Sequence, residues 1–220
     1  MVDGEIVCEL FENNGLTHSV TLLPQIKEVL LQSGLSVNDI DVFAVSSGPG
    51  SFTGLRIGAA TVKGLAANGA GTLGVSTLEA MAYCHRDFEG VICALMDARC
   101  SQVYNALFSF EGGKLQRLCE DRALMIDELL CKIKEINKPI LLVGDGAALV
   151  KKSIDEKLPK AENIMLAEGA SVFKKASGVC LCAYEKIMGG EKAVSAENLN
   201  LEYLRLPQAE RELKKKEKKL

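Results

Sequence analysis

The chain has 220 residues, of which 48% are hydrophobic and 25% charged, and its formal net charge is −3. This length suits one large domain or two small ones with an ordinary packed core, and the negative charge argues against strong autonomous binding to RNA, which needs a basic surface. The eight cysteines include no CxxC pair, which argues against a zinc site or a thioredoxin-like motif, and every apolar run is shorter than the about 20 residues of a membrane span.

In the first half, the spacing of apolar and turn residues predicts strands that alternate with helices. The expected elements are, in order, a strand at 5–11, a helix at 19–32, a strand at 42–45, a helix at 53–67, a short strand near 73–75 and a helix at 77–84. Ser76 is a suitable residue to cap the last of these helices.

The second half repeats this plan with a hairpin added at its start. The expected elements are strands at 91–97 and 103–110, a hairpin turn at 111–113, a strand at 115–119, a helix at 126–136, a strand at 140–143, a turn at 144–146 and a long helix at 171–188. Strands that alternate with helices in this way are typical of an α/β fold.

A glycine-rich turn joins the strand at 42–45 to the next helix. Gly48 and Gly50 can adopt backbone angles closed to other residues, Ser51 or Thr53 can cap the helix, and free amides at a helix start can hold an anion. These four residues form a candidate, degenerate phosphate loop. The alternative is a tight connection that binds nothing. The run is neither a mononucleotide P-loop, because no Gly-Lys-Ser/Thr follows at the right spacing, nor a dinucleotide fingerprint.

The amino-acid sequence of this turn is unusual. The residues from Gly48 to Gly58 read Gly-Pro-Gly-Ser-Phe-Thr-Gly-Leu-Arg-Ile-Gly, which resembles the signature of the TsaB family, also called YeaZ, bacterial proteins needed to make threonylcarbamoyladenosine in tRNA. Segments at 14–24, 96–104 and 203–210 resemble further signatures of the same family, in the same order. These separated matches cover most of the chain.

The resemblance implies a duplicated actin/Hsp70-like α/β fold (ASKHA, ribonuclease H-like), with an N-terminal half at 1–88 and a C-terminal half at 89–220 that ends in a basic tail. When the halves are laid over each other, the strand at 5–11 matches the strand at 115–119. The first half then has no counterpart of 91–110. We therefore expect it to lack its N-terminal strand or strands, and expect a chain begun further upstream to be more stable.

The sequence offers no candidate catalytic residue and no metal site. It contains two histidines, His18 and His85, which are too far apart in sequence for the paired-histidine metal helix of the catalytic relatives, TsaD. Asp97 and Asp145 follow strands where actin-like ATPases place acidic groups, but aspartate also caps turns routinely. We expect no cofactor to bind the chain autonomously, and the resemblance implies that partner subunits use ATP and magnesium. The rival interpretation is an ATP-dependent phosphotransferase or a glycoprotease-like peptidase of the same fold.

The helix expected at 53–67 is rich in small residues, which lower helix stability unless close backbone approach offsets the loss. That approach is either to the molecule's own sheet or to a helix of another subunit, and the resemblance implies the second. The candidate partner-binding residues are Gly54, Arg56, Gly58, Ala60, Thr61 and Gly64.

The resemblance thus implies a cytoplasmic, non-catalytic scaffold subunit with no membrane contact. It would bind the catalytic subunit TsaD, with the ATPase TsaE joining, would also form a homodimer, and would meet tRNA indirectly. The complex moves a threonylcarbamoyl group to the adenine beside the anticodon of tRNAs that read codons beginning with A. The lysine-rich tail at 211–219 is expected to be a solvated helix end, with RNA contact as the alternative.

Overall fold

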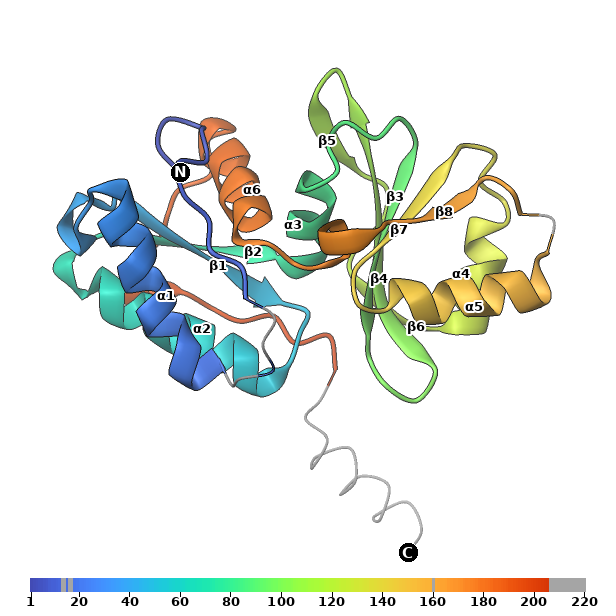
Figure 1. The fold of residues 1–220 in the computed structure, drawn as a ribbon, viewed down its shortest axis with the longest axis horizontal. Coiled ribbons are helices and arrows are strands. Elements are labelled where there is room, and N and C mark those ends of the chain that lie inside the picture. Colours follow the sequence, from blue (N-terminus) through green and yellow to red (C-terminus); the bar gives the residue numbers. More distant parts are fainter. Residues whose placement is uncertain (13–14, 16–17, 160, 206–220) are drawn as a thin grey trace, which may run out of the picture.

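The computed structural model describes residues 1–12, 15, 18–159 and 161–205. The chain forms two halves that lie side by side, each with its own sheet (Figure 1). The helices are α1 (His18–Ser33), α2 (Phe52–Leu65), α3 (Thr77–Tyr83), α4 (Ile126–Ile133), α5 (Ala147–Lys157) and α6 (Ala176–Met188). Short 3-10 turns lie at Val37–Asp39, Ala66–Asn68, Gly169–Val172 and Ala196–Asn198.

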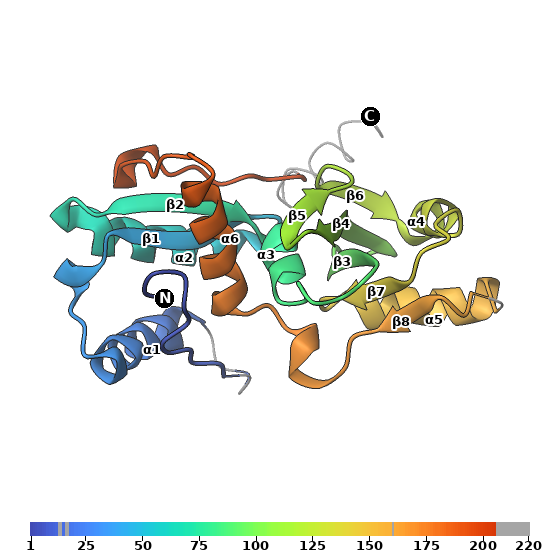
Figure 2. The ribbon, with the colours of Figure 1, turned by 90° about the horizontal axis from the view of Figure 1, so that it is seen from above.

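The first half is built on two parallel strands, β1 (Val42–Gly48) and β2 (Gly71–Ser76). The glycine-rich helix α2 packs on one face of this sheet and α6 packs on the other (Figures 1 and 2). Ser76 accepts a hydrogen bond from the amide of Glu79 at 3.2 Å, which confirms it as the cap of α3. The first half thus has the layered α/β arrangement, with helices on both faces of a parallel pair of strands.

The predicted strand at 5–11 is wrong. Val2 and Glu5 form an isolated bridge with each other, and residues 6–11 have no regular structure. The segment is held instead by the start of α6, because the Glu9 carboxylate accepts a hydrogen bond from the Ser177 amide at 2.6 Å. An acid at a helix N-terminus satisfies an amide that has no partner inside the helix. The proposed match between 5–11 and the hairpin strand of the second half therefore does not hold.

The second half holds a six-stranded sheet in the order β5-β4-β3-β7-β8, with β6 paired to β4. Its strands are β3 (Val91–Asp97), β4 (Gln102–Glu111), β5 (Lys114–Arg117), β6 (Arg122–Met125), β7 (Ile140–Val143) and β8 (Ile164–Leu166). Three of these elements match predicted bounds closely: β3, β4 and β7. The strands β6 and β8 and the helix α5 were not predicted, and α6 begins five residues later than the predicted start at 171.

Alternate residues of β3 enter two different cores, as the period of a strand requires. Cys93 and Leu95 pack with α4 and α5 on one face of the sheet. Ile92 and Ala94 pack with α3 on the other face. The helix α3 thus lies between the two halves, and it also packs closely against α6.

The domain boundary predicted between residues 88 and 89 stays a prediction. The two sheets do lie on either side of it, since β2 ends at Ser76 and β3 begins at Val91. However, α6 follows the second sheet in the chain and packs on the first sheet. The C-terminal segment after α6 also returns to the first half, where Val194 bridges Thr72.

Candidate partner-binding surface and the glycine turn

The turn between β1 and α2 is stabilised from within the chain. Ser51 caps α2 because its hydroxyl oxygen accepts a hydrogen bond from the Gly54 amide at 3.3 Å, whereas Thr53 is exposed. Glu202 donates its amide to the Ser47 carbonyl at 2.8 Å. The C-terminal segment therefore lies directly against the turn.

Gly48 is required here by two independent features. Its φ of +140° is disfavoured for residues with a side chain. A Cβ at this position would also lie well inside van der Waals contact of the Glu202 carbonyl oxygen. The glycine at 48 is thus explained by the approach of the C-terminal segment. The predicted phosphate-loop role of Gly48, Gly50, Ser51 and Thr53 stays a prediction.

The helix α2 has two distinct faces. Its buried face carries Leu55, Ala59 and Val62 against the first sheet and the C-terminal segment. Its outward face carries Arg56, Ala60 and Gly64, which are spaced four residues apart and are all exposed. A Cβ on Gly64 would meet nothing within 4 Å.

The remaining candidate partner-binding residues of α2 do not lie on this outward line. A Cβ on Gly58 would come within 3.3 Å of the Val45 side chain on β1, so the small residue at 58 allows close packing on the molecule's own sheet. Gly54 lies beside its cap, Ser51, and Thr61 is half-buried. The sequence left two explanations open for the small residues of α2. Gly58 packs on the molecule's own sheet, whereas Arg56, Ala60 and Gly64 face outward and are available to a partner.

The neighbouring helix α1 carries apolar side chains that are exposed in the structure. Val20, Leu23 and Leu31 are 66%, 56% and 71% exposed, and α1 lies beside α2 (Figure 1). Large apolar residues gathered on a surface helix mark an interaction site more often than scattered ones do. We use the name helical face for the exposed residues of these two neighbouring helices: Val20, Leu23 and Leu31 of α1 with Arg56, Ala60 and Gly64 of α2.

Asp97 and Asp145 lie together at the carboxyl ends of β3 and β7, and both are engaged by the chain. Asp145 accepts a hydrogen bond from the Asp97 amide at 3.1 Å and pairs with Lys174 at 2.7 Å. Asp97 accepts from the Arg99 amide at 2.7 Å. These are contacts of turn-stabilising aspartates. Within the described residues no three His, Cys, Asp or Glu side chains are grouped so as to hold a metal ion.

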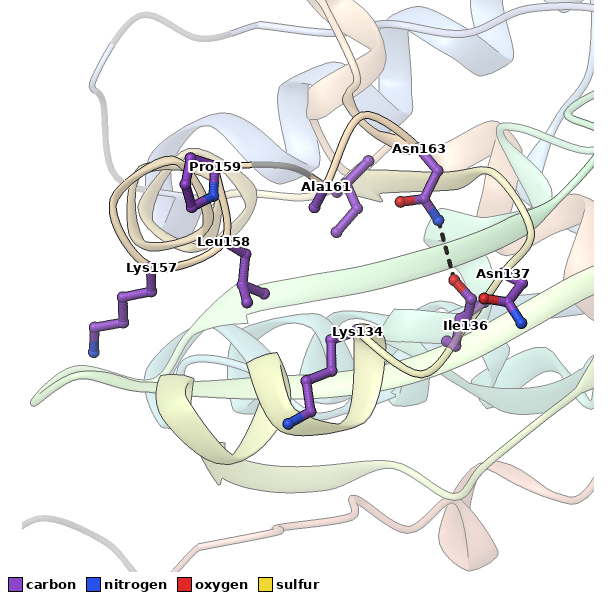
Figure 3. A pocket seen from close by; sticks show the side chains of 9 residues that line it. Lys134, Ile136, Asn137, Lys157, Leu158, Pro159, Ala161 and Asn163 are labelled. Atoms are coloured by element: carbon purple, nitrogen blue, oxygen red, sulfur yellow. Dashed lines mark hydrogen bonds between the residues drawn. The ribbon is translucent and has the colours of Figure 1, made fainter.

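A surface hollow of about 590 Å³ lies at the far end of the second half, between the ends of α4 and α5 (Figure 3). Its floor is apolar, with Ile136, Leu158 and Ala161, and Lys134 and Lys157 stand at its rim. Both lysines sit at helix C-termini, where cations are stabilised by the helix dipole, and Lys157 pairs with Asp127 at 2.5 Å. These lysines are explained without a ligand.

Among the described helices, none has the length and apolar character needed to cross a membrane.

The cysteines differ sharply in expected reactivity. Burial raises the pKa of the Cys93 thiol to about 12, although a hydrogen bond from Asn105 partly opposes that rise. The Cys93 thiol is therefore neutral at pH 8 and inaccessible, whereas Cys100 and Cys131 are exposed. We expect brief alkylation with iodoacetamide at pH 8, read by peptide mass spectrometry, to modify Cys100 and Cys131 and to leave Cys93 untouched. Urea-unfolded protein is the control, in which Cys93 reacts too. Rapid native labelling of Cys93 would contradict its burial.

Comparisons with known proteins show which families and structures this chain is similar to. A sequence model of the family described as "TsaD: tRNA N6-adenosine threonylcarbamoyltransferase" matches residues 12–212. The chain is 31% identical over 209 residues to the tRNA threonylcarbamoyladenosine biosynthesis protein TsaB of Bacillus subtilis, covering 94% of this chain and 88% of that protein. It is 31% identical over 198 residues to TsaB of Escherichia coli, covering 79% of this chain and 86% of that protein.

Solved structures agree with these sequence matches. A crystal structure from Pseudomonas aeruginosa, of a protein described as similar to peptidase YEAZ, superposes with a TM-score of 0.71 at 26% identity and covers 86% of this chain and 85% of that one. YeaZ from Pseudomonas aeruginosa superposes with a TM-score of 0.67 at 25% identity, covering 85% and 84%. The actin-like ASKHA fold implied by the sequence resemblance is thereby confirmed.

Proposed function

The chain belongs to the TsaB (YeaZ) family of tRNA threonylcarbamoyladenosine biosynthesis proteins, and from this we propose that it is a non-catalytic subunit that acts by binding the catalytic subunit TsaD. The observation that carries the proposal is the helical face. It combines small residues on α2, Ala60 and Gly64, with exposed apolar residues on α1, Val20 and Leu23. Small residues let a partner helix approach closely, and apolar ones provide area to bury.

The proposal assigns the chemistry to other subunits. The chain has two histidines in all, distant in sequence, so it cannot form the paired-histidine metal helix of TsaD. The carboxylates of Asp97 and Asp145 make hydrogen bonds and an ion pair within the chain. In this proposal TsaE joins the complex, ATP and magnesium serve the partner subunits, and tRNA is met through the complex in the cytoplasm. The chain's own net charge of −3 fits an indirect role toward RNA.

The decisive experiment uses the full chain with purified TsaD, TsaE, ATP, bicarbonate, threonine, the enzyme that supplies threonylcarbamoyl-adenylate, and tRNA. We expect calorimetry to show binding to TsaD, and mass spectrometry to show modified tRNA only when all of these components are present. The isolated chain should neither hydrolyse ATP nor modify tRNA. ATP turnover by the chain alone, lost when Asp97 is replaced, would support the rival enzyme instead.

A substitution at the centre of the outward face of α2 tests the surface itself. We expect Ala60→Arg to weaken TsaD binding at least about tenfold, equal to about 1.4 kcal/mol, because a long charged side chain prevents close helix approach and would be buried without a partner. The matched control is Ala148→Arg, at an exposed position of α5 in the other half, which should bind normally. Both variants should show unchanged circular dichroism. Wild-type affinity in folded Ala60→Arg would contradict the assignment of this face.

A further inference from the structure

The last described part of the chain forms a strap along α2. The strap, residues 194–205, begins where Val194 bridges β2 at Thr72 and runs toward the junction of the two halves (Figures 1 and 2). Leu199 and Leu201 pack against the buried face of α2. The backbone carbonyl of Glu197 accepts a hydrogen bond from Nζ of Lys63 on α2 at 3.3 Å. The strap is thus attached at several points before it reaches the start of α2.

At that start, the strap builds a three-residue cluster with α2. The rings of Tyr203 and Phe52 stack with centroids 4.7 Å apart and an interplanar angle of 12°. Arg56 donates from Nε to the Tyr203 hydroxyl at 3.2 Å, and its Cζ lies 5.9 and 5.8 Å from the two ring centroids. Beyond the cluster, Arg205 donates to the carbonyl of Ala98 on the hairpin of the second half.

The cluster leaves hydrogen-bond donors of Arg56 without a partner among the described residues. Arg56 and Tyr203 are both exposed. Apart from the bond from Nε to Tyr203, no hydrogen bond or ion pair joins Arg56 to another described residue. The sequence of α2, Phe-Thr-Gly-Leu-Arg-Ile-Gly-Ala-Ala-Thr-Val-Lys-Gly-Leu, contains no acidic residue. Among the described residues the two terminal guanidinium nitrogens of Arg56 therefore have no hydrogen-bond or ion-pair partner. Their donors form the fork that suits a carboxylate.

The composition and place of the cluster fit a binding hot spot. Tyrosine and arginine are enriched among residues that dominate interface energetics. Their mutual stacking already restricts the side chains, so less conformational freedom is lost when a partner binds. Arg56 also begins the outward line that continues through Ala60 and Gly64. The cluster is therefore continuous with the helical face.

We propose that Tyr203 of the strap is part of the TsaD-binding surface, where it and Phe52 hold Arg56 ready to receive a carboxylate on TsaD. This inference rests on the proposed function and extends it to the C-terminal segment, which lies 147 positions from Arg56 in sequence. The occupant is a TsaD surface that presents an acidic side chain beside an apolar one. The acid pairs with the free guanidinium nitrogens, and the apolar group covers the exposed edge of the Phe52 and Tyr203 stack.

The test titrates TsaD into the full-length chain by calorimetry at two salt concentrations. We expect Tyr203→Ala to weaken binding at least tenfold and Tyr203→Phe, which keeps the stack but loses the hydroxyl, to weaken it about threefold. Arg56→Gln should weaken binding and flatten its salt dependence, because an ion pair is screened by salt. The matched control is Phe173→Ala, another partly exposed ring in an aromatic pair, which should bind normally.

The outcomes separate this inference from the proposed function. Wild-type affinity in folded Tyr203→Ala, with loss of binding in Ala60→Arg, would overturn the role of the strap and leave the proposed function standing. Absence of binding by the wild-type chain would overturn both. If Tyr203→Ala lowers the melting temperature, Arg56→Gln decides, because it leaves the ring stack in place. Unchanged affinity and salt dependence in that variant would overturn the carboxylate contact.

Discussion

Replacing Arg117 by alanine is expected to lower the free energy of unfolding by about 3 kcal/mol, because it leaves two largely buried carboxylates without their shared partner. Arg117 on β5 binds Glu79 of α3 and Asp121, each at 2.6 Å, and both acids have only 13% of their side chains exposed. Its guanidinium also lies 4.8 Å from the centroid of the Phe108 ring. The group therefore joins the second sheet to the helix between the halves.

The surrounding contacts explain why this cation is difficult to replace. Burial alone would lower the pKa of Arg117, but its hydrogen bonds to Asp121 and Glu79 and their charges outweigh burial and raise that pKa above its ordinary value. The arginine therefore stays charged wherever the protein is folded. Asp121 further accepts a hydrogen bond from Ser76, the cap of α3. Loss of Arg117 should thus disturb the start of α3 as well.

Urea unfolding followed by circular dichroism measures this effect. The matched control is Arg99→Ala, whose side chain is 87% exposed and whose ion pair with Asp97 is long, at 3.5 Å. Exposed pairs contribute about 0–1 kcal/mol, so the control should lie close to the wild type. A double variant, Arg117→Ala with Glu79→Ala, should lose less than the sum of the single losses. Equal stability of Arg117→Ala and wild type would contradict the structural importance of this cluster.

Gly48→Ala is expected to destabilise the protein by about 3 kcal/mol, since it combines a strained backbone conformation with overlap against backbone atoms. The φ of Gly48 is +140°, and the new Cβ would overlap the Glu202 carbonyl oxygen. The strap cannot yield at this point without breaking the hydrogen bond from Glu202 to Ser47. We therefore also expect faster proteolysis of the strap.

The same substitution at Gly64 provides a control with the opposite sign. Gly64 is exposed within α2, and a Cβ there would meet open space. Gly64→Ala should therefore raise stability by about 0.5–1 kcal/mol, because alanine is the better helix former. Thermal melts of both variants, with limited trypsin digestion of each, test the pair. If Gly48→Ala were as stable as Gly64→Ala, the close approach of the strap would be wrong.

Much of the fold was predictable because local signals agreed with it. The strands at 91–97 and 140–143 are short apolar runs bounded by turn residues, and both match the observed bounds. Ser76 capped the helix it was expected to cap. Two of the missed elements, β6 and β8, are strands of four and three residues, too short to carry much local signal. The third, α5, does carry a helical period in Ala147, Val150 and Ile154, so this helix was predictable from its apolar spacing.

The strand expected at 5–11 failed for a tertiary reason. Its apolar residues suited a strand, but a strand forms only where a neighbour completes its hydrogen bonds. The described chain places Glu9 at the start of α6, 168 positions away in sequence, and the segment follows that contact. A local pattern of apolar residues cannot reveal a contact with a helix so distant in the sequence.

For the functional surface, the sequence alone determined the family, the small residues of α2 and the absence of a paired-histidine metal helix, because these depend on residue identity and spacing. Only the tertiary structure decided which small residues face outward. Gly58 packs toward Val45, whereas Ala60 and Gly64 remain open. The tertiary structure also decided that the strap passes against Gly48 and that the Tyr203 ring stacks on Phe52. The physical reason is that tertiary packing decides which side of a helix is exposed and which distant segments come into contact. Residues 147 positions apart share no local pattern that could reveal such a contact.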